Sequence, residues 1–436
     1  MPVLLNTQDA DFEKNFTALL SAKREDSPDV DSSVARIIAD VQQRGDAAVL
    51  DLTEKYDGVA LRAEELQISA AEIEAACAQV GAKERSALEL AAARITAYHE
   101  KQKPEDAYWT DSTGAELGWR WTPISAAGLY VPGGLASYPS SVLMNAIPAK
   151  VAGVSRLSVV VPCPGGILNP LVLLACKIAG VDEVYRIGGA QAIAALAYGT
   201  QTIAPVDKIT GPGNAYVAAA KRRVFGKVGI DMIAGPSEIL VIADAENDPN
   251  WIALDLLSQA EHDANAQSIL ITDDPEFAVA VADAVENQLK TLERREIAAA
   301  SWRDFGAIIT VSSLREAVAL SDRIAPEHLE LCVVDPKALS AQITHAGAIF
   351  LGGWTPEAIG DYIGGPNHVL PTARSARFSS GLSVMDFLKR TTLAMMHPEA
   401  LRAIGPAAEI LATSESLQAH ALSVTARLRK LNDRAD

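Results

Sequence analysis

The spacing of hydrophobic and polar residues separates two helical ends from a long middle section of a different kind. Residues 1–105 carry apolar positions at helical spacing with charges between them. The strongest signals in that stretch predict helices over 34–55 and 71–101. The chain after Arg390 shows the same periodicity and is predicted to be helical to its end. Between these ends the helical period gives way to shorter elements.

Residues 108–121 are typical of a hairpin that turns near 112–114, because aromatic residues flank a Ser-Thr-Gly turn. From residue 124, short apolar runs are each followed by a Gly-containing turn and a helical segment. The first block of predicted strands comprises 128–131, 157–161, 183–187 and 206–210. A second block of predicted strands comprises 238–243, 268–272, 307–311, 329–334 and 348–351. This alternation predicts βαβ units, and therefore an α/β fold with two mostly parallel sheets.

The length of 436 residues suggests two to four structural units, at about 150 residues per domain. The patterns predict four segments. They are an N-terminal helical segment at 1–105, a first α/β domain at 106–235, a second at 236–390, and a C-terminal helical tail at 391–436.

Composition and charge exclude several classes of function. The net charge is −17 and no Lys/Arg run is present, which argues against a nucleic-acid partner. No stretch of about 18 apolar residues is uninterrupted, so no membrane span is predicted. The first residues lack a basic leader pattern, and none of the four cysteines forms a C-x-x-C pair. We therefore expect a soluble, reduced, cytoplasmic protein.

Histidines are scarce, with seven in the chain, and three of them have contexts typical of structural or solvated residues: His99, His345 and His397. Of the other four, His262 lies three residues after Gln259 in LSQAEHD, on a predicted helix. The two side chains therefore face the same side and can present two ligands to one metal ion. Gln is an unusual ligand, and a polar helix face with a hydrogen-bonded histidine is the alternative.

Three further motifs combine a carboxylate with an imidazole. Glu327 and His328 adjoin in APEHLEL at the end of a predicted strand, where such a pair can exchange protons near neutral pH. A surface Glu beside a capping His is an equal alternative. Asp361 and His368 lie in IGDYIGGPNHVLPT, which is otherwise a tight turn. Glu415 and His420 are five apart in SESLQAH, a weak signal by itself.

Four glycine-containing loops follow or precede predicted strands: GLYVPGG (128–134), RIGGAQAIAAL (186–196), ITGPGNAYV (209–217) and IAGPSE (233–238). The third passes from a strand through Gly-Pro-Gly-Asn to a helix, so its N–H groups can face an anion. No G-x-G-x-x-G occurs, so a dinucleotide site does not follow from that fingerprint. From the sequence pattern alone, ordinary turns between strands and helices are the better explanation of these loops.

Taken in order, these segments resemble the histidinol dehydrogenase family. The resemblance covers about residues 125–390 and includes long stretches around the motifs above, among them GLYVPGGLASYPSSVLMNAIPAKVAGV and IGDYIGGPNHVLPTARSARFSSGLSV. The spacing of Glu415 and His420 follows it. Several motifs in the family's order are far more specific than any one of them.

The resemblance implies the site. It implies one Zn²⁺ per subunit held by Gln259, His262, Asp361 and His420. It implies Glu327 and His328 as the acid–base pair, and an NAD site on the first α/β domain lined by Tyr130, Gln191 and Asn214. The substrate, L-histidinol, would contact the zinc ligands, His328, and also Ser237, His368 and Glu415. The second α/β domain is then the zinc and substrate side.

The resemblance also implies an incomplete Rossmann-like sheet in each α/β domain and a homodimer with shared active sites. The helical tail would cross to the partner subunit, so that His420 completes the partner's site. One departure concerns Ser416, where the family usually has Gly. If that position needs a positive φ, Ser strains the backbone there, although Glu415 and His420 keep their spacing.

The activity implied is the four-electron oxidation of L-histidinol to L-histidine through bound L-histidinal. In this hypothesis zinc acts as a template, His328 takes the hydroxyl proton, and Glu327 then activates water to hydrate the aldehyde. One alternative is a related zinc and NAD dehydrogenase of another small polyol or a sulfonated diol. Others are a zinc hydrolase, which needs no NAD, and a catalytically silent binding protein.

Overall fold

The computed structural model describes residues 2–21, 28–133, 138–233 and 235–433. Gly134 and Ala234, which belong to two of the glycine loops, lie outside the described residues. By their internal contacts the residues form two compact units. The first combines Met1–Gln102 with Ile124–Phe387, and the second combines Lys103–Pro123 with Leu388–Asp436.

The first unit contains a five-stranded sheet with the strand order β6-β5-β4-β7-β8, which we call sheet B. All neighbouring strands are parallel. Its strands are β4 (Ala126–Tyr130), β5 (Arg156–Val160), β6 (Glu183–Tyr185), β7 (Lys208–Thr210) and β8 (Gly229–Ile230). The connecting helices are α6 (Pro139–Ala152), α7 (Pro170–Ile178), α8 (Gly189–Tyr198) and α9 (Ala215–Val224).

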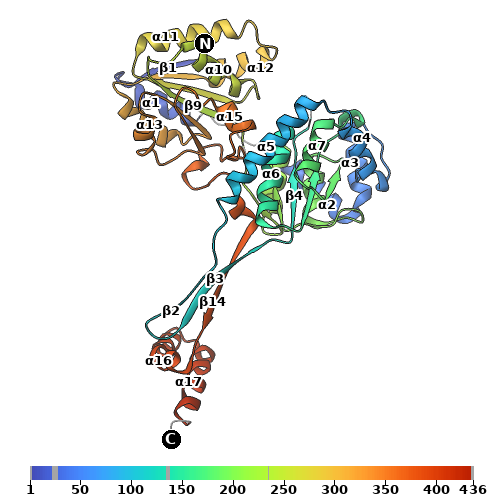
Figure 1. Cartoon of the computed structure of the whole chain (residues 1–436), viewed down its shortest axis with the longest axis vertical. Helices are drawn as coiled ribbons and strands as arrows, with labels where there is room; N and C mark the ends of the chain where they lie inside the picture. The colour runs from blue at the N-terminus through green and yellow to red at the C-terminus, as the bar shows by residue number, and fades with distance from the viewer. Residues whose placement is uncertain (1, 22–27, 134–137, 234, 434–436) are drawn as a thin grey trace. The chain divides into compact units, whose positions relative to one another are not determined.

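The N-terminal helices belong to the same lobe as sheet B. They are α2 (Pro28–Arg44), α3 (Asp46–Asp57), α4 (Ala70–Cys77) and α5 (Ala82–Glu100). Helix α2 packs on α8 and α9, while α5 packs on α6 (Figure 1). Val34, Val41 and Val49 share one apolar core with Ile193 of α8. Burial of this face, at about 25 cal/mol per Å² of apolar surface, is what holds the helices to the lobe.

The second sheet of the first unit, sheet A, has the strand order β1-β11-β10-β9-β12-β13 and is also parallel throughout. Its strands are β1 (Val3–Asn6), β9 (Glu238–Ala243), β10 (Gln267–Thr272), β11 (Ala307–Thr310), β12 (His328–Cys332) and β13 (Ala348–Leu351). Its principal helices are α1 (Phe12–Ser21), α10 (Pro249–Ala260), α11 (Pro275–Gln288), α12 (Arg295–Phe305), α13 (Leu314–Ile324) and the short α15 (Glu357–Tyr362).

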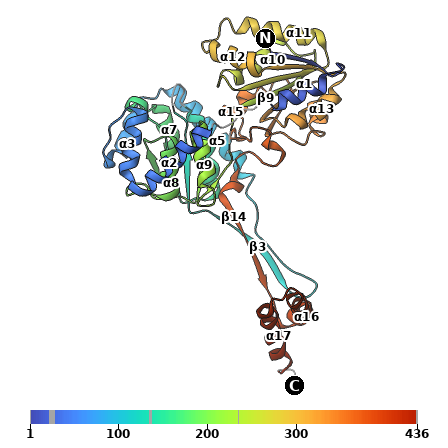
Figure 2. The same ribbon diagram turned by 180° about the vertical axis from the view of Figure 1, so that it is seen from behind.

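Helices cover both faces of sheet A (Figure 2). Ile239 and Val241 of β9 belong to the core that contains α10, α11 and α12 residues. Leu240 and Ile242 alternate with them and belong to the core on the side of α1 and α13. Because successive strand residues point to opposite faces, a strand buried on both sides must be apolar throughout, as β9 is after its first residue.

The two sheets share one connectivity. In each, the first strand of the block is central, the next two lie on one side of it, and the last two lie on the other. This is the Rossmann order without its sixth strand, and the expected α/β class with two incomplete Rossmann-like sheets is confirmed. Each sheet therefore has one switch point, between β4 and β7 in sheet B and between β9 and β12 in sheet A.

The second unit contains a three-stranded antiparallel sheet and a helical hairpin. Strands β2 (Ala107–Thr110) and β3 (Glu116–Pro123) form the predicted hairpin, and β14 (Leu388–Met395) pairs along the whole of β3. Helices α16 (Pro398–Ser414) and α17 (Gln418–Asn432) pack on each other.

Two strands correct the prediction of purely helical ends. Val3–Asn6 form β1 rather than helix, because four residues are too few to show a period and pairing with β11 decides their conformation. Leu388–Met395 form β14, although the chain was predicted to be helical after Arg390. Seven of its eight residues are exposed, so it lacks the in–out alternation that reveals a strand.

Among the described residues, no helix combines the length and the apolar character that crossing a membrane requires. Cys77, Cys163, Cys176 and Cys332 are all buried and free, so no disulfide stabilises the fold.

Candidate active site

The titratable side chains gather at the amino ends of β9 and β12. Glu238 begins β9 and His328 begins β12, and His328 pairs in register with Ile239. Because the two strands are parallel neighbours, their starting residues lie at one edge of sheet A, with Glu327 and Ser237 just before them. Ligands in open α/β sheets usually bind at the carboxyl ends of the strands. The predicted site at Glu327 and His328 instead lies at the amino ends of the strands of sheet A.

His328 has its proton fixed by the backbone. Its Nδ1 lies 3.0 Å from the carbonyl oxygen of Glu238, and a carbonyl can only accept. Nδ1 therefore carries the hydrogen, and Nε2 keeps a free lone pair. Nε2 is buried and has no hydrogen-bond partner among the described residues. This nitrogen is available to take a proton from a bound molecule.

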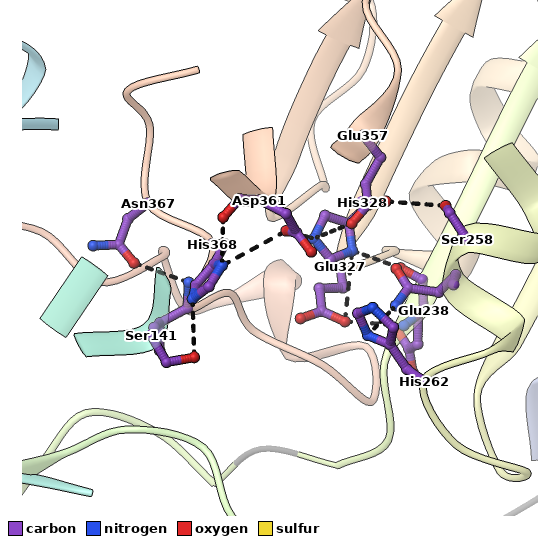
Figure 3. Close-up of polar contacts among 12 residues, drawn as sticks. Ser141, Glu238, Ser258, His262, Glu327, His328, Glu357, Asp361, Asn367 and His368 are labelled. Atoms are coloured by element: carbon purple, nitrogen blue, oxygen red, sulfur yellow. Dashed lines mark hydrogen bonds and ion pairs between the residues drawn. The ribbon is translucent and has the colours of Figure 1, made fainter. Parts of the chain in front are cut away.

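Glu327 lies on the Nδ1 side of His328 (Figure 3), with Oε2 3.7 Å from His328 Nδ1. The same oxygen accepts the backbone N–H of Glu238 at 2.9 Å. Burial, with the charge of Glu238 adding to it, raises the pKa of Glu327 well above its ordinary value of 4.5. A carboxyl group with a raised pKa can act as an acid or a base near neutral pH.

Helix α15 brings two carboxylates to the same place. Glu357 and Asp361 are four residues apart, so both side chains lie on one face of the helix. Glu357 Oε1 lies 3.7 Å from His328 Nε2, and Asp361 Oδ1 lies 3.8 Å from the same nitrogen (Figure 3). Burial and the charge of Glu357 raise the pKa of Asp361 well above its ordinary value.

Gln259 and His262 reach the site from the end of α10. Gln259 is completely buried, and its Nε2 lies 3.3 Å from His262 Nδ1. Gln259 Oε1 is buried without a partner among the described residues. Burial lowers the pKa of His262, which favours the neutral imidazole that binds metals. Figure 3 shows His262 beside Glu238 and Glu327.

The donor set fits a divalent cation. Three buried polar atoms of this site have no hydrogen-bond partner among the described residues: Gln259 Oε1, His328 Nε2 and Glu357 Oε1. A buried polar atom without a partner costs about 1–3 kcal/mol, and such atoms in one place indicate a missing ligand. His328, Glu357 and Asp361 offer ligand atoms within 4.8 Å of one another. Oxygen and imidazole nitrogen atoms are the ligands that zinc takes in sites that act on substrates.

His368 faces Asp361 from the following loop. Its Nδ1 lies 3.0 Å from the Asp361 carbonyl oxygen, and its Nε2 lies 3.4 Å from the Ser141 hydroxyl of α6 (Figure 3). Burial lowers the pKa of His368 to about 4, so the ring is neutral at physiological pH. The residue thus supports the loop through two neutral hydrogen bonds, one of them to the helix that follows β4.

The residues expected to line a dinucleotide site lie around sheet B, after the carboxyl ends of β4, β6 and β7. Tyr130 ends β4, and its hydroxyl accepts the N–H of Gly189 at 3.1 Å. Gln191 is buried in the first turn of α8. Asn214 caps α9, and its Oδ1 accepts the N–H groups of Tyr216 and Val217. These two N–H groups are therefore already occupied, which limits the anion site that the loop sequence suggested.

Glu415 and His420 belong to the second unit, on either side of the turn between α16 and α17, and both are exposed. Ser416 between them has φ +61°, so the positive φ considered for this position is confirmed. The Leu417 N–H donates to the Ala412 carbonyl, a bond typical of helix ends that have a left-handed residue. Ser therefore adopts a conformation that Gly would adopt without strain.

Sequence reasoning missed Glu357 and Glu238. Glu357 had a usable signal, because its spacing of four from Asp361 on a short helix places both carboxylates together. Glu238 had a weaker one, as a charged residue that begins an otherwise apolar strand. Its Oε1 accepts the N–H of Ala373 at 3.0 Å, which ties the loop after His368 to the edge of sheet A.

Comparison with known proteins adds independent findings. The profile of the family described as "Histidinol dehydrogenase" matches residues 20–428. The chain is 76% identical to histidinol dehydrogenase of Ruegeria pomeroyi and 74% identical to that of Cereibacter sphaeroides, covering 99% of this chain and 100% of the relative in both cases. It is also similar to the crystal structure of histidinol dehydrogenase from Elizabethkingia anophelis, with a TM-score of 0.94, 37% identity and 99% of each chain covered.

Proposed function

Because the chain belongs to the histidinol dehydrogenase family, we propose that it oxidises L-histidinol to L-histidine in two NAD-dependent steps. Family membership supports an oxidoreductase of histidine biosynthesis. The observation that carries the proposal further is the free Nε2 of His328, buried beside a carboxyl group with a raised pKa and a set of unpartnered metal donors. These are the groups that oxidation of an alcohol through an aldehyde needs.

Gln259, His262 and Asp361 would hold one zinc ion per subunit together with His420. When bound, zinc supplies a positive charge that binds the amine and imidazole nitrogens of the substrate and fixes its orientation. The unpartnered Gln259 Oε1 and the neutral His262 ring support this assignment. Ser237, His368 and Glu415 are the further residues that we place around the substrate.

His328 acts as the base of both oxidations. Its Nε2 accepts the hydroxyl proton of the substrate, while Nδ1–H stays bonded to the Glu238 carbonyl and fixes the ring. Glu327 then takes a proton from water as the water oxygen adds to the aldehyde carbon. Protonated His328 returns its proton to the carbonyl oxygen, which forms the hydrate and frees His328 to act as a base again. His328 then accepts the hydrate's hydroxyl proton, and a carboxylate results. NAD, when bound, would supply the hydride acceptor for both oxidations.

Tyr130, Gln191 and Asn214 are proposed to line the NAD site. Their place at the carboxyl ends of the sheet B strands, around the β4–β7 switch point, supports this, because dinucleotides bind there in related sheets. Glycine loops at these ends let the backbone approach a bound phosphate closely.

A homodimer with shared sites is part of the proposal. The second unit has few buried side chains, while Ile410 and Leu411 of α16 are 65% and 64% exposed. Large apolar side chains gathered on a small unit support burial against another chain. His420 and Glu415 of one copy would then complete the site of its partner.

The test is NADH formation with L-histidinol, before and after removal of zinc by a chelator. We expect two NADH for each histidine formed, loss of activity on chelation, and recovery on addition of zinc. No NADH from a folded, zinc-loaded dimer would remove L-histidinol as the substrate. Competition by imidazole compounds separates it from a polyol or sulfonated diol, because only an imidazole-bearing substrate shares that contact.

A further inference from the structure

Glu357 is buried in a way that leaves half of its carboxylate unused. Its side chain is 3% exposed. The backbone N–H of Glu357 donates to Glu330 Oε1, and the Ser258 hydroxyl lies 3.2 Å from Glu357 Oε2. These contacts fix the residue at the start of α15. Oε1 has no hydrogen-bond partner among the described residues.

The free oxygen points into the candidate site. Oε1 lies 3.7 Å from His328 Nε2, too long for a hydrogen bond, so the two atoms face a common space (Figure 3). Asp361 Oδ1 faces the same nitrogen at 3.8 Å. A glutamate with a purely structural role would have both oxygens bonded at this depth, since nearly all buried polar atoms find partners.

The local charge shows what the free oxygen would bind. Glu327, Glu357 and Asp361 form no ion pair with Lys or Arg among the described residues, although all three surround His328. Buried carboxyl groups become protonated, pair with cations or coordinate metal ions, and the raised pKa values of Glu327 and Asp361 show that no cation balances these groups within the protein. An anion would be repelled by Glu357, and an apolar group would leave Oε1 unpartnered. The missing partner is therefore a cation or an N–H donor that a cation holds.

We propose that Glu357 Oε1 is a further binding atom of this site, in contact with the divalent metal ion or with an N–H of the substrate amine that the ion holds. The inference rests on the proposed function, which supplies both the metal ion and the amine. It adds a second carboxylate to the set of Gln259, His262, Asp361 and His420. Ser258 and Glu330 are then positioning residues, because Ser258 bonds the carboxylate of Glu357 and Glu330 accepts its backbone N–H.

The variant Glu357→Gln tests this, because the amide keeps the size of the side chain and removes its charge. Zinc affinity is measured without substrate, by competition with a chromophoric chelator, and substrate affinity is measured by titration of L-histidinol into the zinc-loaded full-length protein. We expect at least a tenfold loss in one of the two affinities, an effect of the order found when residues around a metal are changed. Loss of zinc affinity identifies the metal ion as the partner of Glu357, and loss of substrate affinity alone identifies the substrate amine.

Asp255→Asn is the matched control. Asp255 is a partly buried carboxyl group that contacts Glu330 in the same cluster, but it has no free oxygen facing His328. Both affinities should stay within twofold of the wild type. Unchanged affinities in Glu357→Gln would overturn the inference. The proposed function would still stand if the wild type binds zinc and oxidises L-histidinol. If Glu357→Gln fails to fold, Ser258→Ala replaces it, and a change below twofold in both affinities overturns the inference.

Discussion

Sheets A and B have the same strand order, but they accommodate buried charge in different ways. Beside sheet B, Lys221 and Asp231 form an ion pair with side chains 2% and 1% exposed. Both side chains also bond the backbone of Gly211. Lys221 Nζ donates to the Gly211 carbonyl, and the Gly211 N–H donates to Asp231 Oδ2. Charge in this lobe is balanced internally, and it fixes a loop at the carboxyl ends of the strands.

In sheet A the balance is missing. Glu327, Glu330 and Glu357 are buried, and none forms an ion pair with Lys or Arg among the described residues. Their nearest basic group is His328, whose Nδ1–H donates to the Glu238 carbonyl. The comparison teaches that shared topology does not determine where a site lies. The edge of sheet A has buried carboxyl groups without a cationic partner among the described residues, whereas the charges beside sheet B balance each other.

Glu327→Gln should have the largest effect, because it removes a proton acceptor from the unbalanced edge of sheet A. We expect oxidation of L-histidinal to slow by roughly 10²–10⁴-fold, the usual contribution of a general base, with a smaller effect on oxidation of L-histidinol. Rapid-mixing measurements of NADH formation from each substrate give the two rates. Glu246→Gln at the exposed surface is the control. Equal slowing of both steps would contradict the division of roles between Glu327 and His328.

Gly211→Ala tests the loop that the sheet B ion pair holds. Gly211 has φ +110°, and a Cβ atom there would lie 2.1 Å from the Tyr130 carbonyl oxygen. The clash is with backbone, so we expect a loss of about 3 kcal/mol in the free energy of unfolding and weaker NAD binding. Urea denaturation and NAD titration measure these. Gly226→Ala is the control, because Gly226 has φ +97° and nothing lies within 4 Å of the added atom. This variant has the backbone strain without the clash. Equal losses in the two variants would show that the contact with Tyr130 is unimportant.

Asp255→Asn tests how the buried carboxyl groups near sheet A change the stability of the protein with pH. Burial and the charge of Glu357 raise the pKa of Asp255 to about 6, against an ordinary value of 3.8. The folded wild type therefore binds more protons between these values, and it loses stability as the pH rises through about 6. The variant should be more stable by about 1–2 kcal/mol at pH 8, and this advantage should vanish below pH 4. Melting temperatures measured across this pH range show whether the variant is more or less stable than the wild type, and Asp273→Asn is the surface control.

Ser416→Gly should have the smallest effect. Ser416 lies in the second unit, which we propose supplies the zinc ligand His420 to the sheet A site of the partner subunit. Relief of the left-handed strain is worth about 1–2 kcal/mol, and the entropy of Gly removes about 0.5–1 kcal/mol of that. A net gain of about 0.5 kcal/mol in stability is expected in urea denaturation. Ser414→Gly, two residues earlier within α16, should instead destabilise. Destabilisation by both changes would contradict strain at Ser416.

The sequence was most informative where local and tertiary preferences agree. The limits of β9 and β13 match the predicted ranges 238–243 and 348–351, because each is a short apolar run between turn residues. The predicted helix over 34–55 instead breaks into α2 and α3 at Gly45, and the helix α12 had no predicted counterpart. Strand β1 depends on a partner far along the chain, and no local pattern contains that information.

The site was predictable in part for similar reasons. Short spacings brought Gln259 to His262 and Glu327 to His328 in the prediction, and the structure has these pairs in contact or nearly so. The convergence of α10, β12 and α15 at one edge depends on strand order, which no single motif encodes. Glu357 escaped notice because a glutamate in a short helix is usually solvated, and only its burial distinguishes it.

Strand β1 also bears on the order in which the protein is made. Val3 pairs with Ala307, so about 300 residues must be synthesised before the first strand can find its place. At about 5–20 residues per second, that segment waits roughly 15–60 s at the ribosome, while every strand of sheet B has already emerged. Sheet A, which carries Glu327 and His328 at its edge, is therefore the later of the two sheets to be completed. An exposed Val-Leu-Leu segment is meanwhile a place where a chaperone can hold the nascent chain.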